Sequence, residues 1–148
     1  MAQTTGQMTF RNVKVELSSD GSTWFDISGS TSAVTVGGGN RSMAEIKPLF
    51  RDTVIGRPGA RERVTVGVKS VYTENLAEAS DLLSAAYLAG SMIYFRWSPT
   101  GGSAGARRYK TVDAYVTKTD LPSGNVSEAN PLTVDYTLSA EYVEKESV

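Results

Sequence analysis

One segment of the chain matches a catalytic pattern: Gly101-Gly102-Ser103-Ala104-Gly105 fits the G-x-S-x-G motif of a nucleophile elbow. In that motif the serine occupies a strand-to-helix turn, and a histidine elsewhere in the chain serves as its base. The chain contains no histidine, and the residues after the loop alternate in the manner of a strand. The sequence therefore predicts a flexible loop here, without a nucleophile.

The sequence also lacks residues that other kinds of catalytic and metal-binding site require. The chain has neither cysteine nor histidine, which excludes thiolate nucleophiles, disulfides and His-based metal sites. Gly37-Gly38-Gly39 is followed by neither a lysine-serine pair nor a helix pattern, so it is interpreted as a joint that ends a strand and not as a phosphate cradle. Two acids can meet in space from any positions, but no pattern points to such a pair. We predict no enzyme, no catalytic residue, no cofactor and no metal.

Two charged stretches remain. A basic cluster, set against Glu45, Asp52 and Glu62, consists of Arg41, Lys47, Arg51, Arg57, Arg61 and Arg63. An acidic set, with Lys145 as its only nearby base, consists of Glu128, Asp135, Glu141, Glu144 and Glu146. Each stretch is either a solvated face or one side of a contact between copies. Two different complementary surfaces would make a head-to-tail contact, which leads to rings or filaments.

The elements that must position these residues are mostly strands. The length of 148 residues and a hydrophobic fraction of 40% fit a single domain spanning 1–148, and the net charge of −1 gives no general attraction to nucleic acid or membranes. About seven strands are expected, among them alternating runs at 13–17, 63–72, 109–118 and 132–142. Such a sheet must close or stack, so we predict a β-sandwich or barrel with one flanking helix.

The helix is predicted over about 75–90. Asn75 is its expected cap, Glu78 completes a capping box and Gly90 ends it. Its apolar face is expected to hold Leu76, Ala79, Leu83, Ala86 and Tyr87.

Two further segments have distinct roles. Residues from about 37 to 62 contain prolines, glycines and charges, which predicts a long projecting loop or hairpin of functional importance. Residues 143–148 are expected to form an acidic tail. Met1 to Phe10 is polar and lacks the pattern of a secretory signal, and no run is apolar enough to span a bilayer, so a cytosolic product is expected.

Four stretches, read together in order, resemble the major tail tube proteins of long-tailed, siphovirus-type bacteriophages. They are the strand-turn-strand opening from Asn12 to Trp24, the exit from Val36 to Arg41, the run from Val64 to Glu74, and Phe95-Arg96-Trp97-Ser98-Pro99 followed by Gly101-Gly102. The resemblance covers about Asn12 to Tyr142. It implies a sandwich or barrel with a flanking helix, forming six-membered rings whose inner sheets join and whose stack is a hollow conduit for DNA. It also implies a location in the virion tail after synthesis in the host cytoplasm, with tip, terminator and tape measure proteins as partners and no membrane.

The resemblance suggests roles for particular residues. The long loop would reach a neighbouring subunit, and a lumen-facing arginine-rich arm would hold DNA, so we expect subunit contacts at Arg41, Lys47, Phe50, Arg51, Arg57 and Arg61. Asp113, Asp135 and Glu141 are candidate lumen-facing residues, with a solvated outer face as the open alternative. Two other functions stay open: a nucleic-acid-binding small β-barrel, and a virion decoration or carbohydrate-binding β-sandwich.

Overall fold

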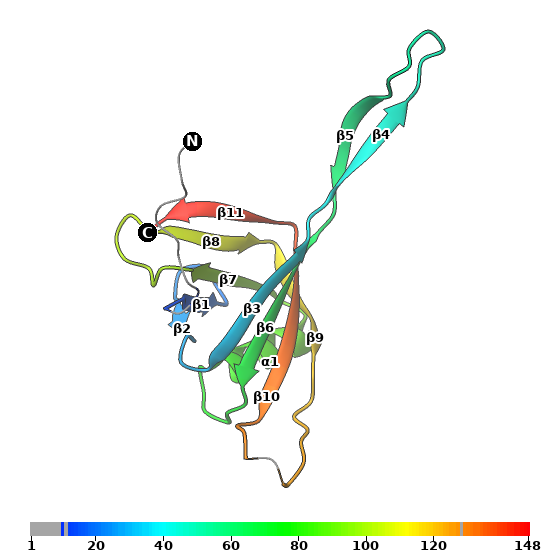
Figure 1. Ribbon diagram of the computed structural model, residues 1–148. Helices are drawn as coiled ribbons and strands as arrows, with labels where there is room; N and C mark the ends of the chain where they lie inside the picture. Colours follow the sequence, from blue (N-terminus) through cyan, green and yellow to red (C-terminus); the bar gives the residue numbers. More distant parts are fainter. Residues whose placement is uncertain (1–9, 11, 128) are drawn as a thin grey trace.

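The protein is mostly β with one helix, and its computed structural model describes residues 10, 12–127 and 129–148. Residues 1–9, where the sequence predicts no secretory signal, and Glu128 of the acidic set lie outside the described residues. Two antiparallel sheets face each other and a separate hairpin projects from them (Figure 1). Sheet A has the order β2 (Phe25–Asp26), β1 (Lys14–Ser18), β7 (Met92–Ser98), β8 (Arg107–Val112) and β11 (Tyr142–Ser147). Sheet B has the order β3 (Thr31–Gly38), β6 (Val64–Val71), β10 (Thr133–Ala140) and β9 (Ala114–Thr119).

The two sheets are joined along one side, because the start of β7 also pairs with the start of β9. One hydrophobic cluster fills the space between them, with Leu17 and Phe95 from sheet A, and Val68 and Leu138 from sheet B, all almost fully buried. The alternation predicted for β6 and β10 is confirmed, since their apolar residues face this cluster. Helix α1 (Ala79–Ala89) adds its buried side to the same core. The sandwich with a flanking helix is therefore the predicted fold class.

Two predicted strands are each divided in two. The run 109–118 breaks at Asp113, whose φ of 48° is left-handed, so β8 stays in sheet A and β9 enters sheet B. The run 132–142 breaks at Glu141, whose backbone N–H donates to the Val112 carbonyl at 2.9 Å. The two bends thus lie side by side. Thr111 is fully buried and hydrogen-bonds through Oγ1 to the backbone of Phe95.

The helix is shorter than predicted at its start. Ala77 has a φ of 61°, which a helix cannot continue through, and the N-cap is Glu78 without a side-chain capping bond, so the prediction for Asn75 is wrong. The carboxylate of Glu78 accepts a hydrogen bond from the Thr73 hydroxyl. Ala79, Leu83 and Ala86 are buried as predicted, whereas Leu76 and Tyr87 are exposed, and Gly90 ends the helix in a left-handed conformation. No helix among the described residues is long and apolar enough to cross a membrane.

Candidate assembly surfaces

The predicted projecting hairpin exists, and we call it the arm (residues 41–61). It consists of β4 (Arg41–Ile46) and β5 (Ile55–Arg61), which pair only with each other within the described residues. It continues the β3–β6 ribbon, because the Gly39 N–H donates to the Arg63 carbonyl at 3.2 Å and the Glu62 N–H to the Asn40 carbonyl at 2.8 Å. The arm therefore extends far beyond the sandwich (Figure 1).

The direction of the arm is set at its root. Gly38 and Gly39 have φ values of 70° and 71°, a conformation that side chains disfavour. A Cβ on Gly38 would come within 2.7 Å of the Arg63 carbonyl oxygen. Arg63 also donates from Nη2 to the carbonyls of Asp113 at 2.8 Å and Ser139 at 3.0 Å, and from Nε to the Ser139 hydroxyl at 2.9 Å. These contacts hold the root against sheet B.

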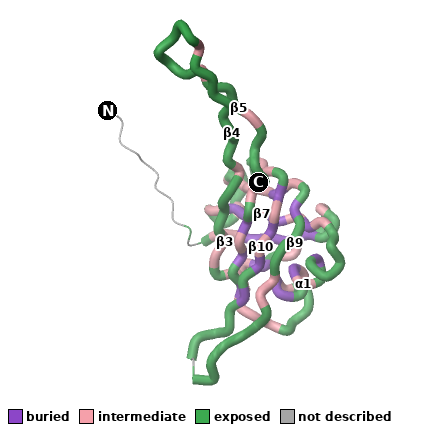
Figure 2. The backbone as a smooth tube through the Cα atoms, turned by 90° about the vertical axis from the view of Figure 1, so that its right-hand side faces the viewer, coloured by how far each residue is buried: buried purple, intermediate pink, exposed green. Residues whose placement is uncertain are grey.

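The arm carries apolar side chains that stay exposed in the part of the chain that the structure describes. Phe50, one of the predicted contact residues, is 89% exposed, and nearly the whole arm is exposed in Figure 2. The other exposed large apolar residues of the arm are Met43, Ile46, Leu49 and Val54, and Val36 of the adjoining strand β3 is exposed as well. Sequence reasoning selected only Phe50 from this group, although the run of apolar residues in a charged segment was a usable signal. An isolated two-stranded ribbon is at best marginally stable, so these side chains favour a partner.

The five predicted basic contact residues fall into two groups. Arg41 and Arg61 lie opposite each other at the root, where Arg41 Nη1 donates to the Gly59 carbonyl at 3.0 Å and the Arg61 guanidinium lies 5.7 Å from the Tyr142 ring centroid. Lys47, Arg51 and Arg57 lie towards the tip. Within the described residues no ion pair involves any charged side chain of the arm.

The C-terminal stretch predicted as an acidic tail is a strand of sheet A. Residues 142–147 form strand β11 of sheet A and not a free tail. Glu146 pairs with Arg108 at 3.0 Å and Glu144 approaches Lys110 at 4.0 Å, because the antiparallel register places each acid opposite a base of β8. These two acids therefore have basic partners within their own chain.

The three candidate lumen residues all lie on or beside the solvent-facing side of sheet B. Asp135 points outward from β10 and lies opposite Lys69 of β6, so its charge has a basic neighbour. Asp113 and Glu141 are exposed at the two bends near the root of the arm. Around Asp135 this face carries small or hydroxyl-bearing residues, including Thr35, Gly67 and Thr137. The face is hydrophilic and close to neutral.

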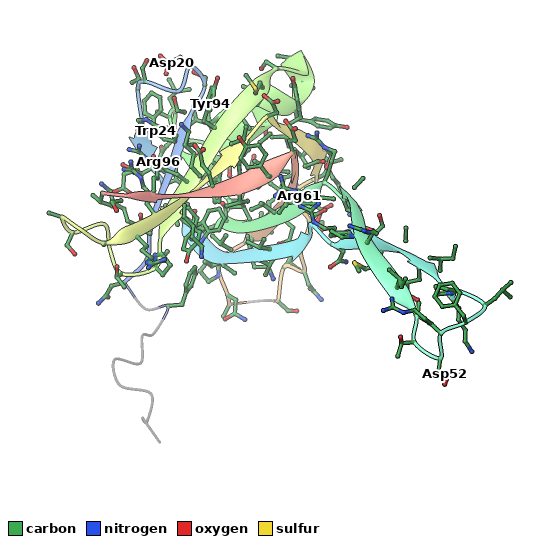
Figure 3. All side chains as sticks on the ribbon, turned by 90° about the horizontal axis from the view of Figure 1, so that it is seen from above. Asp20, Trp24, Asp52, Arg61, Tyr94 and Arg96 are labelled. Atoms are coloured by element: carbon green, nitrogen blue, oxygen red, sulfur yellow. The ribbon has the colours of Figure 1, made fainter. Side chains whose placement is uncertain are left out.

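The outer face of sheet A carries a network that the sequence did not indicate. Glu16 is nearly buried and pairs with Arg96 at 2.7 Å and Lys14 at 3.2 Å. The Arg96 guanidinium also lies 3.7 Å from the Trp24 ring centroid (Figure 3). Burial alone would raise the pKa of Glu16, but the hydrogen bonds from Arg96 and Lys14 outweigh it and lower that pKa. These charges are satisfied within the chain.

Asp20 shapes the turn between β1 and β2. Its Oδ1 accepts hydrogen bonds from the backbone N–H groups of Ser22 and Thr23, each at 2.8 Å, and from the Ser18 hydroxyl at 2.9 Å. The backbone donors of Thr23 and Ser22 hold the pKa of the Asp20 carboxyl far below its usual range. This exposed side chain is therefore an anion throughout the physiological range.

The loop with the G-x-S-x-G pattern joins two antiparallel strands, β7 and β8, instead of a strand and a helix. Ser103 therefore lacks the strand-turn-helix setting of a nucleophile elbow. Within the described residues, no group of three or more acidic side chains is arranged to hold a metal ion.

Comparisons with known proteins identify the fold. No family model and no curated protein sequence matches the chain. Among solved structures, the SPP1 tail tube superposes with a TM-score of 0.71 at 16% identity, over 96% of this chain and 80% of that one. A chain of the PVC extracellular contractile injection system, in its sheath-tube complex, gives 0.65 at 18% identity over 96% and 93%. A chain of the tail of an empty gene transfer agent particle, refined with C6 symmetry, gives 0.67 at 10% identity over 93% and 96%. This chain therefore has the fold found in tail and injection-system tube assemblies.

Proposed function

We propose that the protein is the structural subunit of a bacteriophage tail tube, in which six-membered rings stack into a hollow conduit for DNA. The observation that carries the proposal is the arm, a long hairpin whose apolar residues are exposed and whose charges form no ion pair within the described residues. A projecting element of this kind becomes stable when a neighbouring copy covers it. The fold shared with tube assemblies, one of them with C6 symmetry, supports the same reading.

Ring closure would use the edges of sheet B. Within the described residues, β3 pairs only with β6, so its outer edge presents free backbone donors and acceptors. At the other side of the sheet, β9 pairs with β7 only through its first two residues, Ala114 and Tyr115. Two different edges can join head to tail, and such a contact closes into a ring when the rotation fits. Sheet B of successive copies would then form one continuous wall.

The uncovered face of sheet B suits the lumen of such a wall. Its hydroxyl and glycine residues, with Asp135 beside Lys69, give a hydrophilic surface without a basic patch. DNA binds tightly where lysine and arginine neutralise several phosphates, so a near-neutral wall lets it pass. Asp113, Asp135 and Glu141 would lie on or at the rim of this wall. Tip, terminator and tape measure proteins would be further partners in the virion tail.

The burial of the aromatic side chains favours a structural role over a nucleic-acid-binding barrel. The aromatic residues Phe95, Trp97 and Tyr136 are buried, so they are not free to stack on bases as in a nucleic-acid-binding barrel. The proposed role requires no catalysis.

The test is removal of the arm. Because the Glu62 N–H bonds to the Asn40 carbonyl, residues 41–61 can be replaced by an Asn-Gly turn without separating β3 from β6. The shortened protein should unfold cooperatively like the full chain but form no tubes in negative-stain electron micrographs at concentrations where the full chain does. Tubes of normal diameter from the shortened protein would contradict the role given to the arm.

A further inference from the structure

A cleft of about 320 Å³ lies between helix α1 and the adjoining ends of β1 and β7. It is open because three of the four helix positions that line it are alanines: Ala85, Ala86 and Ala89. Leu17 and Ile93 form its apolar floor on the sheet side. Ala85 and Ala89 are exposed, so the cleft is accessible from outside. Its volume is near the lower end of the range of about 300–1,000 Å³ that accepts compact ligands.

The tip of the arm has a shape and chemistry that fit such a cleft. The Arg51 N–H donates to the Pro48 carbonyl at 3.2 Å, which closes a turn with Leu49 and Phe50 at its centre. Both side chains project into solvent. Lys47 and Arg51 flank the turn and Asp52 follows it, so the tip presents two apolar side chains beside two cations and one acid.

The charges around the cleft are complementary to those of the tip. The lining segments 17–19 and 82–93 hold no charged residue, and Asp20 and Asp81 directly adjoin them in the sequence. Asp20 stays ionised because of its backbone hydrogen bonds. Helix α1 has no basic residue in its last turn, so no lysine or arginine there offsets the partial negative charge of its terminal carbonyls. An apolar cleft whose lining segments adjoin two acids thus matches an apolar tip whose two cations outnumber its one acid.

The arm and the cleft lie on different parts of the molecule. The arm leaves the sandwich on the side away from α1 in the view from above, and it rises away from α1 in the ribbon view (Figures 1 and 3). We infer that the cleft beside α1 receives the arm tip of a second copy of this chain, with Leu49 and Phe50 against Ala85 and Ala89. This inference rests on the proposed function, because it names the surface that the arm contacts. The contact is head to tail, so it propagates from copy to copy.

Engineered cysteines test the contact directly, because the natural chain has none. Leu49→Cys combined with Ala85→Cys should form disulfides between copies under mild oxidation of assembled tubes, seen as a ladder of multimers on non-reducing gels. Disulfides form when the two Cα atoms lie within about 7 Å. The matched control combines Leu49→Cys with Ser84→Cys, one residue earlier and about 100° around the helix from Ala85. At least fivefold more cross-linking in the first pair supports the inference, and equal or absent cross-linking in assembled tubes overturns it.

A second pair of variants tests whether the cleft must be empty. Ala89→Phe fills the cleft from an exposed position and should raise the critical concentration for assembly at least tenfold while leaving the melting temperature unchanged. Leu88→Phe is the control, since Leu88 is exposed on α1 but does not line the cleft. Normal assembly of Ala89→Phe would overturn the inference.

The two proposals fail in distinguishable ways. If loss of the arm prevents tube formation but filling the cleft does not, the arm binds elsewhere and only the present inference is wrong. If the full chain and the arm-deleted chain both stay monomeric at all concentrations, the proposed function fails and the inference fails with it.

Discussion

Replacement of Phe50 by alanine separates the stability of the subunit from the stability of its assembly. Phe50 is 89% exposed in the isolated chain, so Phe50→Ala should change the free energy of unfolding of the monomer by less than about 0.5 kcal/mol. In an assembled tube each copy would bury this side chain once. Burial of a phenylalanine side chain contributes about 1.5–3 kcal/mol. Since each 1.4 kcal/mol is a factor of ten, the contact should weaken roughly 10- to 100-fold.

The critical concentration for assembly measures this change, by light scattering and by the protein left in the supernatant after sedimentation. Urea unfolding of the monomer measures the other quantity. Thr53→Ala, an exposed polar change on the same arm, is the matched control and should leave both unchanged. Leu17→Ala, in the core, should instead act on the monomer and lower its free energy of unfolding by about 2–5 kcal/mol. The reasoning is refuted if Phe50→Ala destabilises the monomer by more than about 1 kcal/mol, or shifts the critical concentration less than twofold.

Three further predictions concern the monomer. Gly38→Ala should lower the free energy of unfolding by at least about 1–2 kcal/mol, because φ is 70° and the new Cβ would meet the Arg63 carbonyl oxygen at 2.7 Å. Gly29→Ala is the control, because a Cβ there meets no atom within 4 Å, and it should change the free energy of unfolding by less than about 0.5 kcal/mol. Thermal unfolding of both variants measures the two changes. Arg63→Ala removes three hydrogen bonds at the root of the arm and should cost about 1–2 kcal/mol in urea unfolding, and Arg63→Lys should not restore it, because lysine lacks the guanidinium fork. Glu16→Gln should destabilise the protein at neutral pH. Because the pKa of Glu16 is lowered on folding from its ordinary 4.5, the stability it contributes is present above that pH and is lost as the pH falls through the lowered value. Unfolding curves of the two proteins should therefore converge at low pH, and a constant difference would contradict this origin.

Several features of the fold could be predicted from residue order alone. Apolar residues at every second position predicted the inward faces of β6 and β10, because a strand turns successive side chains to opposite faces. The prolines, glycines and charges of the segment 37–62 predicted that it leaves the sandwich. Gly90 was correctly placed at the end of the helix. The absence of histidine and cysteine excluded their chemistry without any structure.

Other features depended on contacts between distant parts of the chain. The apolar pattern continues without interruption through Asp113 and Glu141, so it could not indicate that both strands bend there and change sheets. The sequence could not indicate that Glu144 and Glu146 have basic partners, because Lys110 and Arg108 come opposite them only through the pairing of β11 with β8.

The cleft beside α1 arises in the same way, because its lining comes from segments 17–19 and 82–93, which only folding brings together. Periodicity is a local property that the sequence determines by itself. Which charge is paired, and which apolar surface stays open, depend on strand neighbours that only the tertiary structure decides.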